Sequence, residues 1–259
     1  MIAGEVGILD WGIGGLGFFR ELRALRPDVD VRYWSDTGAI PYGQLSRKAL
    51  AARLCAVIAR LAELGAGCVV IACNAASTAI RDLSPPIPVV GIIEPAIAHV
   101  VELKNQPRGP RTVGVVGGGR TIRSGIYRRH LVAAGLTVIQ RIAQPLSGLV
   151  EAGQLSGPAV DAAMAAILAP LAGIDALLLA CTHYPALAPR FRAHLPGVTL
   201  IDPAAALAAQ VIDRWQLAPG NGRTTFMTTG DAAAMQRSAQ AAFALHIPGQ
   251  EVEPGGYWP

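Results

Sequence analysis

The chain has few cysteines and few aromatic residues, and both shortages restrict its function. Of its 259 residues, four are Cys, and only 5% are Phe, Trp or Tyr. Four cysteines without a CxxC pair argue against a disulfide scaffold and favour a reducing compartment, so we expect a cytoplasmic protein. Tyr127 alone lies among the arginines of the middle of the chain, which is too few aromatic side chains for a series of stacking platforms, so we expect no nucleic-acid partner.

Long apolar runs and clustered histidines are also missing. No apolar run approaches the roughly 18 residues that a membrane span needs, so we expect no membrane partner. The N-terminus carries Glu5 and Asp10 and no basic cluster, which argues against a signal peptide. The five histidines are scattered and form no HExxH motif, so we expect no metal site.

The charge that is present is mostly positive and comes from arginine. The formal net charge is +4. Because few aromatic residues accompany these arginines, we interpret them as a solvated helix face that steers an anionic substrate. The arginines of the middle of the chain are Arg108, Arg111, Arg120, Arg123, Arg128, Arg129 and Arg141.

Two short segments, 68–76 and 176–184, are nearly the same. Each is an apolar run followed by Ala, Cys and a small polar residue, with Cys73 in the first and Cys181 in the second. Such runs without alternation are typical of buried strands in a parallel sheet. Ligands of open α/β sheets bind where the strands end. We therefore expect the two thiols to approach one site from two halves of the chain.

The alternation of strand and helix patterns predicts a doubly wound parallel sheet. A polar, breaker-rich segment at 104–111 predicts a domain boundary, after which residues 112–116 restart the pattern with a strand and a glycine loop. The two halves therefore form a weak internal repeat. The last residues, 248–259, have the composition of a tail.

The thiols support two kinds of chemistry. One thiol on each face of a carbon can remove a proton from one side and return one from the other, as in a two-base racemase. Alternatively, Cys181 with His183 is the usual pair for nucleophilic catalysis, which leaves a hydrolase open. Cys55 lies mid-helix and Cys68 at a strand start, and we interpret both as structural.

A glycine loop offers a third possibility. Gly12, Gly14 and Gly17 fit G-x-G-x-x-G after a strand, and Asp36 follows at about the spacing of a dinucleotide fingerprint. A nucleotide-binding module is therefore an alternative, although Asp10 directly before the loop would repel a pyrophosphate.

Three further residues extend the candidate site. We expect Thr121 to be the N-cap of a helix whose first N–H groups suit a carboxylate. Glu151 and His183 are candidate acid–base partners of the thiols.

Several motifs, in order along nearly the whole chain, resemble the glutamate racemases of the aspartate/glutamate racemase superfamily. They are Asp10-Trp11-Gly12-Ile13-Gly14-Gly15-Leu16, Asp36-Thr37 with Pro41-Tyr42-Gly43, Cys73-Asn74, Gly91-Ile92-Ile93-Glu94-Pro95, Thr121-Ile122-Arg123-Ser124-Gly125, Cys181-Thr182-His183-Tyr184-Pro185 and Thr228-Thr229-Gly230-Asp231.

The resemblance implies two similar α/β domains with the active site in the cleft between them. Residues 1–95 plus 205–259 would form the N-terminal domain, completed by the C-terminal segment, and residues 96–204 the second. A small amino acid would be the substrate and no cofactor would be needed. The product, D-glutamate, would supply peptidoglycan. The chain is compatible with a monomer or a homodimer.

The resemblance also assigns roles. Cys73 would handle the proton of the D-enantiomer and Cys181 that of the L-enantiomer. Asp10 would assist Cys73, while Glu151 and His183 would assist Cys181. The implied substrate contacts are Asp10, Trp11, Tyr42, Gly43, Asn74, Ala75, Thr121, Thr182 and His183.

Two positions depart from the family pattern. Trp11 stands where the family has Ser, and Ala75 stands where it has Thr. Losing those hydroxyls removes hydrogen bonds on the order of 1 kcal/mol each. A racemase of another amino acid, such as aspartate or something larger, is therefore an alternative.

Overall fold

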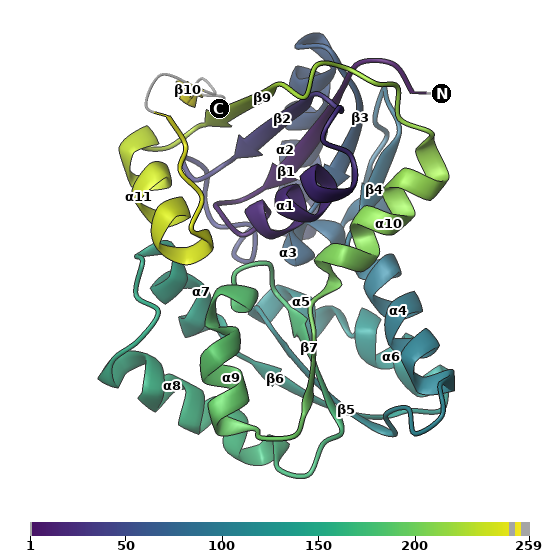
Figure 1. The fold of residues 1–259 in the computed structure, drawn as a ribbon, viewed down its shortest axis with the longest axis vertical. Helices are drawn as coiled ribbons and strands as arrows, with labels where there is room; N and C mark the ends of the chain where they lie inside the picture. The colour runs from purple at the N-terminus through teal and green to yellow at the C-terminus, as the bar shows by residue number, and fades with distance from the viewer. Residues whose placement is uncertain (1, 249–251, 255–259) are drawn as a thin grey trace.

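The computed structural model describes residues 2–248 and 252–254, which form two lobes (Figure 1). The first lobe is built around a six-stranded parallel sheet and the second around a four-stranded parallel sheet. Helices cover both faces of each sheet, so the expected fold class is confirmed. The helices are α1 (Leu16–Leu25), α2 (Arg47–Glu63), α3 (Asn74–Ser77), α4 (Ile93–Asn105), α5 (Gly119–Ser124), α6 (Ile126–Ala133), α7 (Gln144–Glu151), α8 (Pro158–Leu168), α9 (Ala188–His194), α10 (Pro203–Trp215) and α11 (Ala232–Phe243).

The strands of both sheets follow the same winding. In the first sheet the order is β10-β9-β2-β1-β3-β4, and in the second it is β6-β5-β7-β8. The side of the sheet to which successive strands are added therefore changes between β1 and β3, and again between β5 and β7. Such switch points bind ligands in open α/β sheets. The strands are β1 (Glu5–Asp10), β2 (Val31–Ser35), β3 (Ala66–Ile71), β4 (Val89–Gly91), β5 (Thr112–Gly117), β6 (Thr137–Ile142), β7 (Ala176–Ala180), β8 (Thr199–Ile201), β9 (Thr224–Thr228) and β10 (Val252–Pro254).

The central strands are buried on both faces, as their uninterrupted apolar runs predict. All side chains of β1 and β7 are buried, and β3 is buried except at one position. Cys73 follows β3 and Cys181 follows β7, so the two cysteines occupy equivalent places at the two switch points.

Local capping explains where several helices begin. The side chain of Ser46 accepts a hydrogen bond from Ala49 N–H at the start of α2. Asp231 caps α11 in the same way. The expected cap at Thr121 is wrong, because Gly118 is the N-cap of α5 and Thr121 lies inside the helix. Gly118 has extended backbone, and the Oε1 of Gln144 accepts a hydrogen bond of 3.1 Å from the Gly119 N–H at the start of the helix.

The end of the chain returns to the first lobe. Strand β9 pairs with β2, and α10 packs against α1 and α4. The tail expected at 248–259 is partly wrong, since Val252–Pro254 forms β10 beside β9; residues 249–251 and 255–259 lie outside the described residues. The assignment of 1–95 plus 205–259 and of 96–204 to two domains stays a prediction. Among the described helices, none is long and apolar enough to cross a membrane.

Candidate active site

The two switch points meet across the boundary between the lobes. Asp10 ends β1, and its Oδ2 accepts a hydrogen bond of 2.8 Å from the hydroxyl of Thr182, which follows Cys181. Its Oδ1 accepts from the backbone N–H of Trp11 at 2.6 Å. Asp10 is fully buried, so its carboxylate is held by neighbours from both lobes instead of by water.

A short relay leads from α7 to the sulfur of Cys181. Glu151 Oε1 accepts hydrogen bonds from His183 Nε2 at 2.5 Å and from the backbone N–H of Ile13 at 2.9 Å. The other ring nitrogen of His183, Nδ1, lies 3.7 Å from the Sγ of Cys181. The structure therefore brings together the predicted partners Glu151, His183 and Cys181. Glu151 also contacts the glycine loop through Ile13.

The His183–Glu151 pair is held in its charged form. Burial lowers the pKa of His183, but its hydrogen bonds to Cys181 and Glu151 outweigh this and raise that pKa well above 6.5. Burial raises the pKa of Glu151, yet the hydrogen bond and the charge of His183 bring it below the ordinary 4.5. An imidazolium therefore places an N–H beside the sulfur of Cys181.

Cys73 has the opposite surroundings. Burial raises the pKa of its thiol well above 9.0, and the carboxylate of Asp10 adds to this rise. The backbone N–H groups of Ala76 and Ala75 oppose it by hydrogen bonding to the sulfur. The charge of Cys181 also acts on Cys73, which means that the two thiols are electrostatic neighbours. One thiol is thus kept protonated while the other faces an imidazolium.

The site contains a side-chain amide whose N–H₂ group has no hydrogen-bond partner among the described residues. Asn74 is buried, and its Oδ1 accepts a hydrogen bond of 2.7 Å from the hydroxyl of Tyr127 in the second lobe. Its Nδ2 is buried without a hydrogen-bond partner among the described residues. Because a buried unpaired donor is costly, this amide is suited to a ligand acceptor. Nothing in the sequence near Tyr127 signals its role.

The glycine loop is filled by side chains of the second lobe. A Cβ on Gly12 would lie 1.8 Å from Glu151 Oε1, and one on Gly14 would lie 2.3 Å from Thr182 Oγ1. The carbonyl of Gly12 also accepts from the hydroxyl of Tyr33 at 2.8 Å. These glycines therefore permit the close approach of the lobes, and a pyrophosphate has no room beside them.

Asp36 does not serve a nucleotide either. It is fully buried, and Arg53 binds its carboxylate through Nη2 at 2.6 Å and Nε at 2.9 Å. Its Oδ2 also accepts from the hydroxyl of Tyr42 at 2.7 Å. The hydroxyl of Tyr42 is thus already used, and a ligand contact at Tyr42 and Gly43 would come from their backbone.

The two departures from the family pattern lie on the first lobe. The indole Nε1 of Trp11 donates to the carbonyl of Ala39 at 3.0 Å, so the ring is fixed to the chain after β2. Trp11 and Ala75 are both half-buried and pack against the same core cluster of the first lobe. The large side chain of Trp11 therefore packs and hydrogen-bonds within its own lobe.

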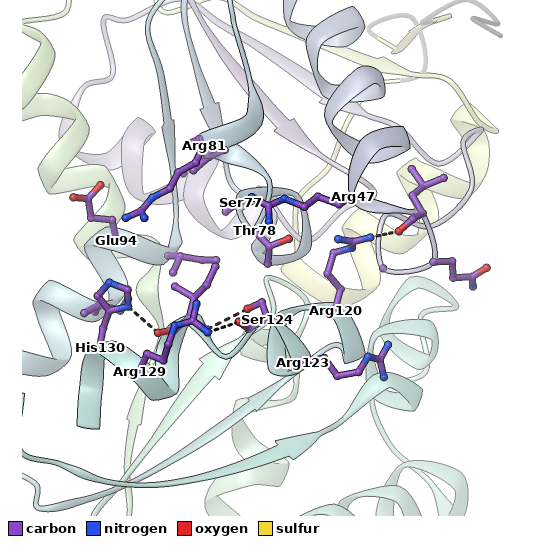
Figure 2. A pocket seen from close by; sticks show the side chains of 18 residues that line it. Arg47, Ser77, Thr78, Arg81, Glu94, Arg120, Arg123, Ser124, Arg129 and His130 are labelled. Atoms are coloured by element: carbon purple, nitrogen blue, oxygen red, sulfur yellow. Dashed lines mark hydrogen bonds between the residues drawn. The ribbon is translucent and has the colours of Figure 1, made fainter. Parts of the chain in front are cut away.

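A cavity lies between the lobes, lined by residues of both. Its volume is about 750 Å³. Figure 2 shows it bordered by arginines from both lobes. The expectation of a solvated arginine face is wrong for Arg120, whose guanidinium donates to the carbonyls of Tyr42 and Leu45 across the boundary. The arginines that line the cavity are Arg47, Arg81, Arg120, Arg123 and Arg129.

No group of three or more His, Cys, Asp or Glu side chains within 2–248 and 252–254 is arranged to hold a metal ion. The site that these residues do form consists of two thiols, two carboxylates, one imidazolium and one unpaired amide.

The chain is similar to known racemases over most of its length. A family model described as Asp/Glu/Hydantoin racemase matches residues 20–211. A protein named glutamate racemase from Aquifex aeolicus (strain VF5) is 33% identical over 256 residues, which cover 96% of each chain. A solved glutamate racemase from Thermus thermophilus, in complex with β-chloro-D-alanine, is 32% identical with a TM-score of 0.82, covering 96% of this chain and 95% of that one. A solved glutamate racemase isoform from Bacillus anthracis is 26% identical with a TM-score of 0.85, covering 98% and 97%.

Proposed function

The chain belongs to the Asp/Glu/Hydantoin racemase family, and we propose that it interconverts L- and D-glutamate by moving a proton between two thiols. The observation that carries this proposal is the placement of Cys73 and Cys181 at the equivalent switch points of two sheets, close enough for their charges to interact. Relatives named glutamate racemase support the choice of substrate.

The two thiols have different surroundings. The ring Nδ1 of His183 faces the sulfur of Cys181, and we assign Cys181 the role of the base that accepts the α-proton of L-glutamate. Cys73 remains a thiol because burial and Asp10 disfavour its anion. The resting site therefore holds one base and one acid, as a two-base reaction requires.

The reaction follows from this pairing. The thiolate of Cys181 removes the α-proton of L-glutamate, and the electron pair of the broken C–H bond stays on the substrate. The thiol of Cys73 then delivers its proton to the opposite face, which gives D-glutamate. Cys181 ends as a thiol and Cys73 as a thiolate, and Asp10 is placed to help return the proton to Cys73. The reverse reaction starts from that second state.

Several groups are suited to holding the amino acid. The free Nδ2 of Asn74 is a donor for a substrate carboxylate, and the buried carboxylate of Asp10 can accept from the ammonium group. We assign the remaining contacts to the backbone of Tyr42, Gly43 and Ala75, and to positions 11, 121, 182 and 183. No cofactor is needed, because the proton donors and acceptors are all side chains of the chain. The product would supply peptidoglycan synthesis in the cytoplasm.

Aspartate is the second candidate substrate. The observation that favours it is the loss of two hydroxyls at Trp11 and Ala75, which changes how the site meets the amino acid. A shorter side chain would need fewer contacts on that face. Comparing kcat/KM for both amino acids separates the two candidates.

Deuterium exchange tests the mechanism. Purified protein is incubated in D2O with each pure enantiomer of glutamate, and optical rotation and α-deuteration are followed together. We expect the product enantiomer to carry deuterium while the remaining substrate keeps hydrogen during the first turnovers, because each thiol serves one face.

Serine variants sharpen this test. Cys73→Ser and Cys181→Ser should each abolish racemisation in both directions, since both thiols act in every turnover. Residual exchange should be confined to L-glutamate in Cys73→Ser and to D-glutamate in Cys181→Ser. Cys55→Ser is the matched control, because Cys55 lies in the middle of α2, away from the site. Racemisation by either of the first two variants would contradict the two-base mechanism.

A further inference from the structure

Arg120 reaches from the second lobe to the first (Figure 2). It lies in α5, and its Nε donates to the carbonyl of Tyr42 at 3.0 Å while its Nη2 donates to the carbonyl of Leu45. Both acceptors belong to the 41–45 loop, whose turn is closed by a hydrogen bond of 2.8 Å from Gln44 N–H to the carbonyl of Pro41. One side chain thus binds a turn of the opposite lobe at two points.

This contact depends on the shape of the guanidinium. A planar fork presents several N–H donors in fixed directions, so Nε and Nη2 can serve two carbonyls of one turn together. A lysine ammonium is a compact point charge on a flexible stem and does not reproduce that geometry. A lysine at position 120 should therefore keep only part of the hydrogen bonding to the carbonyls of Tyr42 and Leu45.

The loop and α5 both carry proposed substrate contacts. Thr121 directly follows Arg120 and is 1% exposed, while Gly43 lies between the two carbonyls that Arg120 binds. The second lobe also covers Gly43, because a Cβ there would lie 4.0 Å from Gln144 Oε1. Arg120 therefore joins, across the cleft, the two stretches that would hold the amino acid.

The loop is fixed separately on its own lobe. The hydroxyl of Tyr42 donates to Asp36, which Arg53 binds in turn. That anchor lies within the first lobe and does not involve the second. The anchor from Arg120 crosses the cleft, so it ties the loop to the position of the second lobe.

We propose that Arg120 is a positioning residue that holds the backbone of Tyr42 and Gly43 against Thr121 in the closed state. This role rests on the proposed function and adds to it a residue that touches neither the thiols nor the amino acid. Its loss should weaken substrate binding more than proton transfer, because the thiols and their partners lie on other segments.

The kinetic test compares Arg120→Ala, Arg120→Lys and Arg123→Ala. Arg123 lines the same cavity, is exposed and carries the same charge, so its variant controls for steering of an anionic substrate. We expect Arg120→Ala to raise KM for both enantiomers about tenfold or more, since charged hydrogen bonds are lost, with kcat changed much less. Millimolar guanidinium should lower the KM of Arg120→Ala part of the way to the wild-type value, and the KM of Arg120→Lys should lie between those of the wild type and Arg120→Ala. An unchanged KM, or an equal rise in Arg123→Ala, would overturn the proposal.

Hydrogen exchange tests the same role without substrate. The Gln44 amide, which closes the turn of the 41–45 loop, should exchange faster in Arg120→Ala than in the wild type or in Arg123→Ala. This result is independent of catalysis, so it stands even if the protein does not racemise glutamate. Equal protection of the 41–45 amides in all three folded proteins would refute the role of Arg120.

Discussion

Replacing Glu151 by Gln tests the charged relay most directly. Glutamine keeps an oxygen for Ile13 N–H and for His183 Nε2–H, so the variant removes a charge and little else. Removing one partner of a fully buried ion pair costs about 3–5 kcal/mol. Because Glu151 keeps 19% of its side chain exposed and Gln retains both hydrogen bonds, we expect a loss of about 2 kcal/mol in the free energy of unfolding near neutral pH.

The pH dependence of that loss has a defined sign. The folded pKa of Glu151 is lowered, so its contribution is present above about 4.5 and is lost as the pH falls through the folded value. The folded pKa of His183 is raised, so its contribution is complete below about 6.5 and is lost as the pH rises through the folded value. The stability gap between wild type and variant should therefore be widest at about pH 5–6.5 and should narrow on either side.

Urea unfolding across this pH range measures the gap. Glu102→Gln is the control, because Glu102 faces His99 in an exposed pair at 3.7 Å and should contribute less than about 1 kcal/mol. Racemisation by Glu151→Gln should also fall more at high pH than at low pH, as His183 loses its proton earlier. A gap that is the same at about pH 6 and pH 9 would refute the ion pair.

Two further substitutions test the closed interface and the loop anchor. Gly14→Ala places a Cβ 2.3 Å from Thr182 Oγ1, so Thr182 must shift. We expect kcat/KM to fall at least about tenfold in a racemisation assay, with a loss of about 1–3 kcal/mol in the free energy of unfolding. Asp36→Asn weakens a buried pair with Arg53 and should destabilise the protein by about 2–4 kcal/mol in urea unfolding, and an unchanged unfolding midpoint would contradict the assigned anchor.

The sequence predicts those parts of the site that depend on strand ends. Parallel strands bring their carboxyl ends to one edge of a sheet, so apolar runs followed by Cys73 and Cys181 were enough to place both thiols at switch points. His183 could be named as a partner because it lies two positions after Cys181. Glu151, 30 positions before Cys181, has no such local signal, and its role is implied by the resemblance to the racemase family.

Other features depend on how the lobes meet, which no local pattern reports. Thr121 has the composition of a cap, but Gly118 takes that role and leaves the threonine inside the helix. The hydrogen bond from Tyr127 to Asn74 joins residues 53 positions apart. Arg120 belongs to a run of arginines that looks solvated, and only the position of the opposite loop makes it a cross-lobe donor.

The pairing of β9 with β2 has a consequence for biosynthesis. Strand β2 emerges from the ribosome early, whereas β9 follows the whole second sheet, so nearly 190 residues of synthesis separate the two partners. Until Thr224–Thr228 arrives, β2 is an unprotected edge with free N–H and C=O groups, a place where another nascent chain can add. The second sheet is contiguous in the chain and can fold first. Only the last strands then seal β2, and the cleft between the lobes is completed at the end of translation.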